Sequence, residues 1–241
     1  MHRFASPAKV LRFANALHPW LMAATLLCLG LGVYFSLFHS PPDYQQGETV
    51  RIMYVHVPSA WMAMFIYSVM AAGSFVFLVF RHGIGDIIAR ASGWIGAWFA
   101  LLTLVTGSLW GKPMWGAWWV WDARLTSMLV LFFLYLGYVI IARQADHDET
   151  AQKTCAVLAI VGFINIPVIK FSVEWWHTLH QPASVLRLDG PAIASDMLVP
   201  LLLMALAFTF FYFTIVIYGM NTVVSRAKLH RLRLQRMNER A

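Results

Sequence analysis

A tryptophan-rich segment is the feature of this 241-residue sequence most suggestive of chemistry. Residues 110–126 read W-G-K-P-M-W-G-A-W-W-V-W-D-A-R-L-T and hold five of the 11 tryptophans. These are Trp110, Trp115, Trp118, Trp119 and Trp121. Indole rings bury a large apolar area and stack on flat groups, and the interleaved glycines let such a group come close. The segment predicts a surface for a large planar ligand, beyond the interface anchoring for which tryptophan is also used.

Charged side chains in the same segment suggest which planar ligand this is. Lys112 and Arg124 are suited to pair with carboxylates at the ligand edge, and Asp122 to cap a helix start or orient Arg124. A porphyrin has a flat apolar ring for the indoles and two propionate carboxylates at its edge for the cations. Because the sequence has no C-x-x-C-H motif, haem would be held as b-type haem, without covalent links to this chain.

Haem iron also needs axial ligands, and neutral imidazole is the usual protein donor. Among nine histidines, His56 lies in Y-V-H-V-P, where Pro58 is expected at the first turn of a helix, and His180 lies in W-W-H-T-L-H-Q. Both are expected at the mouths of helices, flanking the tryptophan segment. His39 and His177 are the other histidines predicted on the same side of the membrane.

The elements that position these residues are predicted to be membrane helices. Hydrophobic residues make up 60% of the chain and charged residues 12%, which excludes an ordinary soluble domain. Six continuous apolar runs are long enough to cross the bilayer, and they do not alternate as barrel strands would. They are Trp20 to Phe38, Pro58 to Phe80, Ile87 to Leu109, Leu125 to Ala142, Thr154 to Ile169 and Met197 to Gly219. We expect one all-α integral membrane domain over residues 1–241, with the first run a helix rather than a cleaved signal.

The distribution of Lys and Arg predicts how the domain is oriented. Thirteen lie in the two terminal segments and in the second and fourth connections, whereas the other side has five. Both termini are therefore expected in the cytoplasm, as in an inner-membrane-type protein, with the tryptophan segment on the outer side of the membrane. The basic tail after Gly219 is interpreted as a topology signal near anionic lipid, and no nucleic-acid partner is expected.

The connection between the third and fourth helices is predicted to contain a short helix of its own. Gly111, Lys112 and Pro113 should end the third helix, because proline lacks the donor that an interior turn needs. Beyond that break, Trp115, Trp119 and Asp122 would share one helical stripe. The pattern predicts a short amphipathic helix that lies along the outward-facing interface of the membrane.

Four motifs together resemble the CcmC family, which handles haem in cytochrome c maturation. They are P-x-D-Y-Q-Q-G at 41–47, R-I-M-Y-V-H-V-P at 51–58, the run from Thr106 to Thr126, and S-V-E-W-W-H-T-L-H-Q at 172–181. The third resembles the family signature called the WWD domain. The resemblance covers almost the whole chain and implies that His56 and His180 are the axial ligands, with Trp110 to Arg124 contacting haem. His177, Pro182 and Ala183 depart from the family pattern around the second ligand.

The resemblance also implies a function and a set of partners. Members of this family bind haem at the outer face and promote its transfer to the periplasmic chaperone CcmE, together with the small subunit CcmD. The ABC-type proteins CcmA and CcmB then help to release the loaded chaperone. The chain is thus expected to be a haem-presenting scaffold without an ATP site or turnover of its own, with haem lyase-like assistance to chaperone loading left open.

Three other functions are weighed against this one. A cytochrome c synthase of the WWD type is usually larger, with more histidines in the membrane. A haem-containing quinol oxidoreductase would need paired histidines within the bilayer, and none of the six runs contains a histidine. A haem permease ranks lower because Asn165, Pro167 and Lys170 cluster at one helix end and outline no continuous polar path.

Overall fold

The fold is an all-helical bundle in the part of the chain that the computed structural model describes, residues 7–146, 148–176, 178–181, 184–185, 187 and 189–239. His177, Pro182 and Ala183 lie outside the described residues. The helices are α1 (Pro7–Tyr34), α2 (Met53–Phe80), α3 (Gly83–Trp115), α4 (Ala123–Ala142), α5 (Glu149–Gly162), α6 (Asn165–Trp175) and α7 (Ser195–Asn238). With α5 and α6 taken as one span, six are long and apolar enough to cross a membrane, which confirms that prediction.

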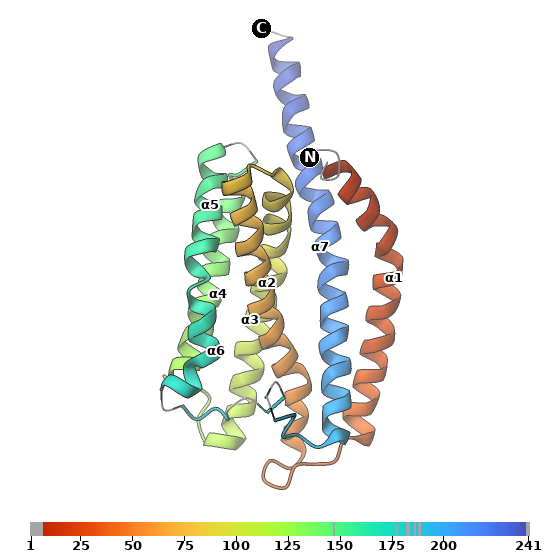
Figure 1. Cartoon of the computed structure of the whole chain (residues 1–241), viewed down its shortest axis with the longest axis vertical. Coiled ribbons are helices and arrows are strands. Elements are labelled where there is room, and N and C mark those ends of the chain that lie inside the picture. Colours follow the sequence, from red (N-terminus) through yellow and green to blue (C-terminus); the bar gives the residue numbers. More distant parts are fainter. Residues whose placement is uncertain are drawn as a thin grey trace.

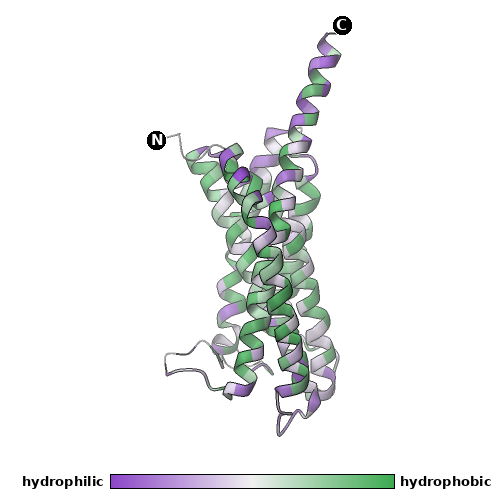
Figure 2. Ribbon diagram, turned by 90° about the vertical axis from the view of Figure 1, so that its right-hand side faces the viewer, coloured by the Kyte–Doolittle hydropathy of each residue, from purple (hydrophilic) through white to green (hydrophobic). Residues whose placement is uncertain are grey.

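The helices run roughly parallel to one long axis and divide the molecule into two ends (Figure 1). The α2–α3 hairpin lies at the centre, α7 packs against it with α1 on its outer side, and α4, α5 and α6 lie on the opposite flank. One end holds the start of α1 and the extension of α7. The other end, here called the tryptophan end, holds the α1–α2, α3–α4 and α6–α7 connections. Figure 2 shows apolar residues along the middle of the bundle and polar residues toward both ends.

Close contacts between small residues make the central hairpin rigid. A Cβ atom added to Gly73 of α2 would lie 2.7 Å from the carbonyl oxygen of Gly85 in α3, so the two backbones touch. Farther along α3, Gly96 leaves room for the ring of Tyr135, whose hydroxyl donates to the Ala63 carbonyl over 2.7 Å. These contacts join α2, α3 and α4 into one scaffold.

Helix α2 begins earlier than the sequence predicted. A 3-10 turn over Glu48–Ile52 leads directly into α2 at Met53, so Pro58 lies inside the helix rather than at its first position. The preceding turn supplies the hydrogen-bonded nucleus, and Pro58 then costs the helix only one backbone bond. As a result, His56 lies within the first turns of α2 and its position is fixed by the helix.

The predicted break at Gly111–Pro113 and the predicted interfacial helix are both wrong. Helix α3 continues through Lys112 and Pro113 to Trp115, and residues 116–122 form an irregular connection. Pro113 leaves the Leu109 carbonyl without its usual donor, but it lies only two residues before the helix ends at Trp115, so no other turn of α3 has to continue past it. Gly116 ends the helix in the left-handed region at φ +75°, and its N–H donates to the Lys112 carbonyl over 3.0 Å.

The fifth predicted span is two helices rather than one. Helix α5 ends at Gly162 and α6 begins at Asn165, with a tight turn between them. Pro167 is the third residue of α6 and cannot donate to the Phe163 carbonyl, so a continuous helix would lose that bond. Instead, the N–H of Ile166 donates to Phe163 over 3.0 Å.

Helix α7 continues well past the predicted end at Gly219. Its 44 residues correspond to about 66 Å at the usual rise, about twice the hydrocarbon thickness of a bilayer. The basic C-terminal segment is therefore a helical extension that projects beyond the bundle (Figure 1).

Candidate functional site

Hydrogen bonds at the tryptophan end tie the α1–α2 connection to the end of α3 and the α6–α7 connection to the α3–α4 connection. Trp110 donates from Nε1 to Oε1 of Gln46 in the α1–α2 connection over 2.9 Å. His180 in the α6–α7 connection pairs with Asp122 in the α3–α4 connection. The predicted site residues thus lie at one end of the bundle and are held there by hydrogen bonds.

His56 is held by a hydroxyl of α3. Its Nδ1 lies 3.0 Å from Oγ1 of Thr106, and the Thr106 hydroxyl donates its own proton to the Leu102 carbonyl over 2.6 Å. The Thr106 oxygen therefore accepts from His56, which assigns the proton to Nδ1 and leaves a lone pair on Nε2. Gly107 makes the close approach possible, because a Cβ there would lie 3.0 Å from Cε1 of His56.

His180 is held by a carboxylate. Its Nδ1 lies 3.2 Å from Oδ2 of Asp122, and its ring meets that of Trp115 edge to face with 4.9 Å between centroids. Burial lowers the pKa of His180 below its ordinary value of 6.5, although Asp122 acts in the opposite direction. The ring is therefore neutral at pH 7, with Nδ1–H donating to Asp122 and Nε2 available as a ligand.

Asp122 fixes both the helix start and the histidine. Its Oδ1 accepts from the N–H of Leu125 over 2.8 Å, which caps α4 as the sequence predicted. Its Oδ2 is free for His180, and the carboxylate side chain is only 5% exposed. One buried residue thus positions a helix and a candidate ligand together.

The two imidazoles face a shared environment. His56 and His180 lie close enough that a proton on one ring would repel a proton on the other. Arg124 lies close enough to repel a proton on either ring. Each ring also has an indole beside it, since Trp110 meets His56 edge to face at 5.6 Å between centroids. The structure thus brings together the two predicted ligands and two of the predicted tryptophans.

The other three tryptophans of the segment form a separate surface. Trp118, Trp119 and Trp121 line an apolar groove of about 520 Å³ on the α3–α4 flank. The rest of its lining comes from Leu104, Val105, Ser108, Leu109 and Leu129. Trp121 is 76% exposed, whereas Nε1 of Trp119 is buried with no hydrogen-bond partner among the described residues. This surface has exposed apolar area for a flat ligand and one donor that lacks an acceptor.

The two predicted cations differ in how available their side chains are to an anionic ligand. Arg124 donates to Oγ of Ser172 over 3.2 Å and to the carbonyls of Ile169 and Lys170, so it fastens α4 to α6. Lys112 is exposed, donates to the Gly116 carbonyl over 3.0 Å and lies 5.9 Å from the centre of the Trp118 ring. Arg124 is therefore first a structural tie, and Lys112 is the more available partner for an anionic edge.

The geometry fits a ligand that brings most of its own coordination. The described residues contain no group of three or more His, Cys, Asp or Glu side chains able to hold a bare metal ion. Two imidazoles suffice for a metal whose other four positions are filled by a macrocycle. The unpartnered Trp119 donor and the exposed indoles suit the same kind of ligand.

Sequence reasoning missed several residues that complete the site. Thr106 and Gln46 lie within the motifs that carried the family resemblance, but threonine and glutamine have no distinctive spacing. Their roles come from contacts between helices that only the fold creates. His39, by contrast, packs against Tyr34 and Phe35 on its own segment.

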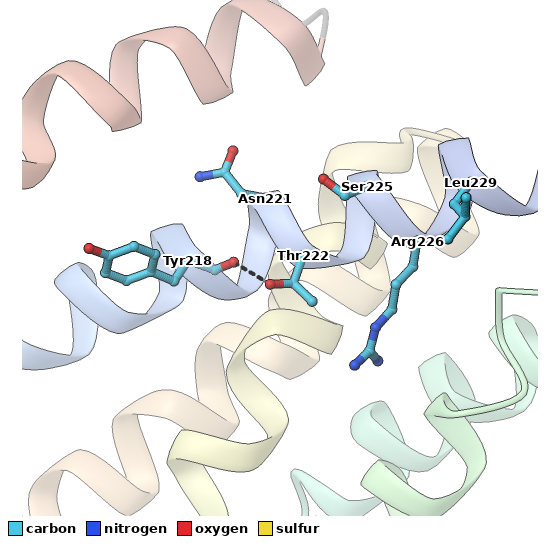
Figure 3. Close-up of a pocket in the computed structure, with 6 residues that line it drawn as sticks. All are labelled: Tyr218, Asn221, Thr222, Ser225, Arg226 and Leu229. Atoms are coloured by element: carbon cyan, nitrogen blue, oxygen red, sulfur yellow. Dashed lines mark hydrogen bonds between the residues drawn. The ribbon is translucent and has the colours of Figure 1, made fainter.

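A second hollow lies near the opposite end of the molecule, on α7 (Figure 3). Its volume is about 350 Å³, and its lining is Tyr218, Asn221, Thr222, Ser225, Arg226 and Leu229. Among these lining residues there is one cation and no histidine, so this hollow lacks the imidazole donors found at the tryptophan end. The candidate site is the one at the tryptophan end.

Known proteins of similar sequence share one family description. The model of a family described as "CcmC: Heme exporter protein C" matches residues 1–235. A heme exporter protein C of Bradyrhizobium diazoefficiens is 47% identical, over 98% of this chain and 90% of that protein. A heme exporter protein C of Haemophilus influenzae is 44% identical, over 95% and 94%. A putative cytochrome c biosynthesis ccmC-like mitochondrial protein of Marchantia polymorpha is 48% identical, over 75% and 76%.

Proposed function

Because this chain belongs to the heme exporter protein C (CcmC) family, we propose that it binds haem at the tryptophan end and presents it to the periplasmic chaperone CcmE. The observation that carries the proposal is the pair of neutral imidazoles at one end of the bundle. Each has Nδ1 engaged by a hydrogen bond, His56 with Thr106 and His180 with Asp122. Each therefore has Nε2 free to donate to iron.

The tryptophans and histidines have different physical tasks in this proposal. Indole surfaces bury the macrocycle and contribute roughly 25 cal/mol per Å² of apolar area, whatever the state of the iron. The imidazoles fix the depth of the macrocycle and hold its iron. Lys112 and the buried Trp119 N–H are suited to the propionates. The haem is b-type and held without covalent bonds, as expected in a chain that must give it up.

The proposed site lies on the periplasmic side of a bacterial inner membrane. Arg and Lys are concentrated at the end where α1 begins and α7 extends, which is the pattern of a cytoplasmic end. The tryptophan end is opposite. Haem bound there is positioned for a periplasmic acceptor, with CcmD, CcmA and CcmB as the partners that help in loading and release.

The ligand assignment is tested by the visible and EPR spectra of the purified protein with haem bound. Wild type is expected to show six-coordinate low-spin iron, and His56→Ala or His180→Ala to lose one ligand and shift toward high spin. His39→Ala and His177→Ala are the matched controls and should keep the wild-type spectrum. Loss of low-spin iron in His177→Ala, with His180→Ala unchanged, would contradict the assignment.

A further inference from the structure

The two candidate ligands differ in the group behind them. Nδ1 of His180 donates to the carboxylate of Asp122 over 3.2 Å, whereas Nδ1 of His56 donates to the hydroxyl of Thr106 over 3.0 Å. One support carries a full negative charge and the other is neutral. Their distances are similar, so the difference between the two histidines lies in charge.

The charge on Asp122 is directed at His180. Oδ1 of Asp122 accepts from the N–H of Leu125, and among the described residues His180 is the side chain hydrogen-bonded to Oδ2. Arg124, two residues away, also interacts with the Asp122 charge, but its hydrogen bonds go to Ser172 and to carbonyls of α6. A buried carboxylate behind Nδ1–H makes Nε2 a stronger donor, as in the outer shells of metal sites.

The groups behind His56 are all neutral: the Thr106 hydroxyl and the backbone carbonyl of Thr103. The Thr106 hydroxyl proton is committed to the Leu102 carbonyl over 2.6 Å, so the oxygen acts toward His56 only as a neutral acceptor. Such an acceptor fixes the ring orientation and tautomer but adds little electron density to Nε2. Two similar ligands are thereby made unequal by their surroundings.

We propose that Asp122 makes His180 the retained ligand and that Thr106 leaves His56 the exchangeable one, so that haem transfer starts with loss of the His56 bond. The proposal rests on the haem-binding function proposed above. In this step the bond between iron and Nε2 of His56 breaks, and a donor atom of the acceptor fills the vacant position. Iron keeps its oxidation state and His56 remains neutral, so no further reactant is needed.

Secondary structure alone would favour the opposite order, with the His180 bond lost before the His56 bond. His56 is fixed on α2, whereas His180 lies in the α6–α7 connection outside any helix. Backbone mobility alone would release the connection first. Asp122 reverses the order because it ties His180 to the N-terminus of α4. The two accounts therefore make opposite predictions for the same variants.

The test compares Thr106→Val with Asp122→Ser in the full chain loaded with ferric haem in nanodiscs. Asp122→Ser keeps an oxygen to cap α4 and removes the charge behind His180. The measurements are the spin state, the rate at which cyanide displaces one histidine, and the rate of haem loss to an apoprotein scavenger.

Thr106→Val is expected to stay low-spin, with cyanide exchange about 3–10-fold faster and haem loss nearly unchanged. Thr106→Ser should restore the wild-type exchange rate, which a merely structural defect would not permit. Asp122→Ser should lose haem about 10–100-fold faster, the range found when outer-shell partners are removed. Asp122→Asn should shift toward high spin, because an amide N–H facing Nδ1 favours the tautomer with a protonated Nε2.

The opposite pattern would overturn the proposal. This pattern is rapid haem loss in Thr106→Val with little change in Asp122→Ser, or equal effects of the two on all three measurements. A wild-type protein without two histidine ligands would instead defeat the haem-binding function itself, so the two failures are distinguishable.

Discussion

At the residue scale, the protonation of His180 is set by two opposing influences. Burial of the ring disfavours the imidazolium and lowers the pKa, whereas Asp122 favours it through its charge and its hydrogen bond. Burial is the larger influence, and Arg124 acts in the same direction. The ring consequently stays neutral, and able to bind iron, at pH values where an exposed histidine is already half protonated.

This balance predicts the pH dependence of haem binding. A proton competes with iron for Nε2 only when the pH approaches the pKa, which in the folded protein lies below 6.5. Haem affinity should therefore be flat from pH 8 to 6.5 and fall at lower pH, by up to about tenfold per pH unit for one competing proton. Haem titrations across this range in wild type and His39→Ala check the profile. A decline that is already complete at pH 7 would contradict it.

Residue types could be predicted from the sequence more readily than their supports. His56, His180 and Asp122 stand in distinctive motifs, and the cap formed by Asp122 followed from its place before an apolar run. Thr106 could not be identified as a support, because a hydroxyl in a membrane helix usually bonds to its own backbone. Its second contact exists only because α2 and α3 pack closely.

At the scale of elements, the connection from Gly116 to Asp122 owes its shape to its two ends. Gly116 terminates α3 in the left-handed region, and Asp122 starts α4 with its carboxylate. Between them the backbone has no helical bonds, so the tryptophans are released from a common helical face. Trp115, the last residue of α3, contacts His180, whereas Trp118 and Trp121 in the connection are exposed beside the groove.

This element is predicted to capture haem independently of the iron ligands. Replacing Trp115, Trp118 and Trp119 together with Ala should remove several kcal/mol of contact, at about 25 cal/mol per Å² plus roughly 0.5–1.5 kcal/mol per stacked pair. Haem should then be largely absent from purified protein, as measured by bound haem per chain.

The matched control replaces three tryptophans away from the segment, Trp20, Trp94 and Trp98, which are also exposed. That variant should retain haem at the wild-type ratio. If the segment only anchors the loop at the membrane surface, the Trp115/Trp118/Trp119 variant will carry as much haem as the control.

Element ends were the part of the fold that sequence patterns predicted least well. Pro58, Pro113 and Pro167 were each informative, but a proline can open a helix, lie in its last turn or separate two helices. Here Pro58 and Pro113 lie inside helices and Pro167 accompanies a break. The choice depends on neighbouring turns and packing, which local sequence does not specify.

At the scale of the whole molecule, composition and run length were sufficient to predict six spans. The backbone must satisfy its own hydrogen bonds in lipid, so long apolar runs have little freedom to be anything but helices. The convergence of three connections at one end follows from the even number of crossings between them. Their contacts, such as Gln46 with Trp110, required the folded structure.

The same architecture predicts the membrane topology. Reporter fusions after Gln46, Trp118 and Gln181 should all read periplasmic, and a fusion after Asn238 should read cytoplasmic. Alkaline phosphatase and fluorescent-protein reporters at each position provide complementary readings. A cytoplasmic reading after Trp118 would place the site on the wrong side for a periplasmic acceptor.

The measurement that tests the central claim most directly is the transfer of haem to the chaperone CcmE. Wild-type protein and the His56→Ala/His180→Ala double variant are brought to equal membrane levels with the chaperone and its membrane partners, and haem on the chaperone is measured. The account predicts loaded chaperone with wild type and with His39→Ala, and at least a tenfold loss with the double variant. Equal loading by the double variant would contradict the claim that these two histidines present haem.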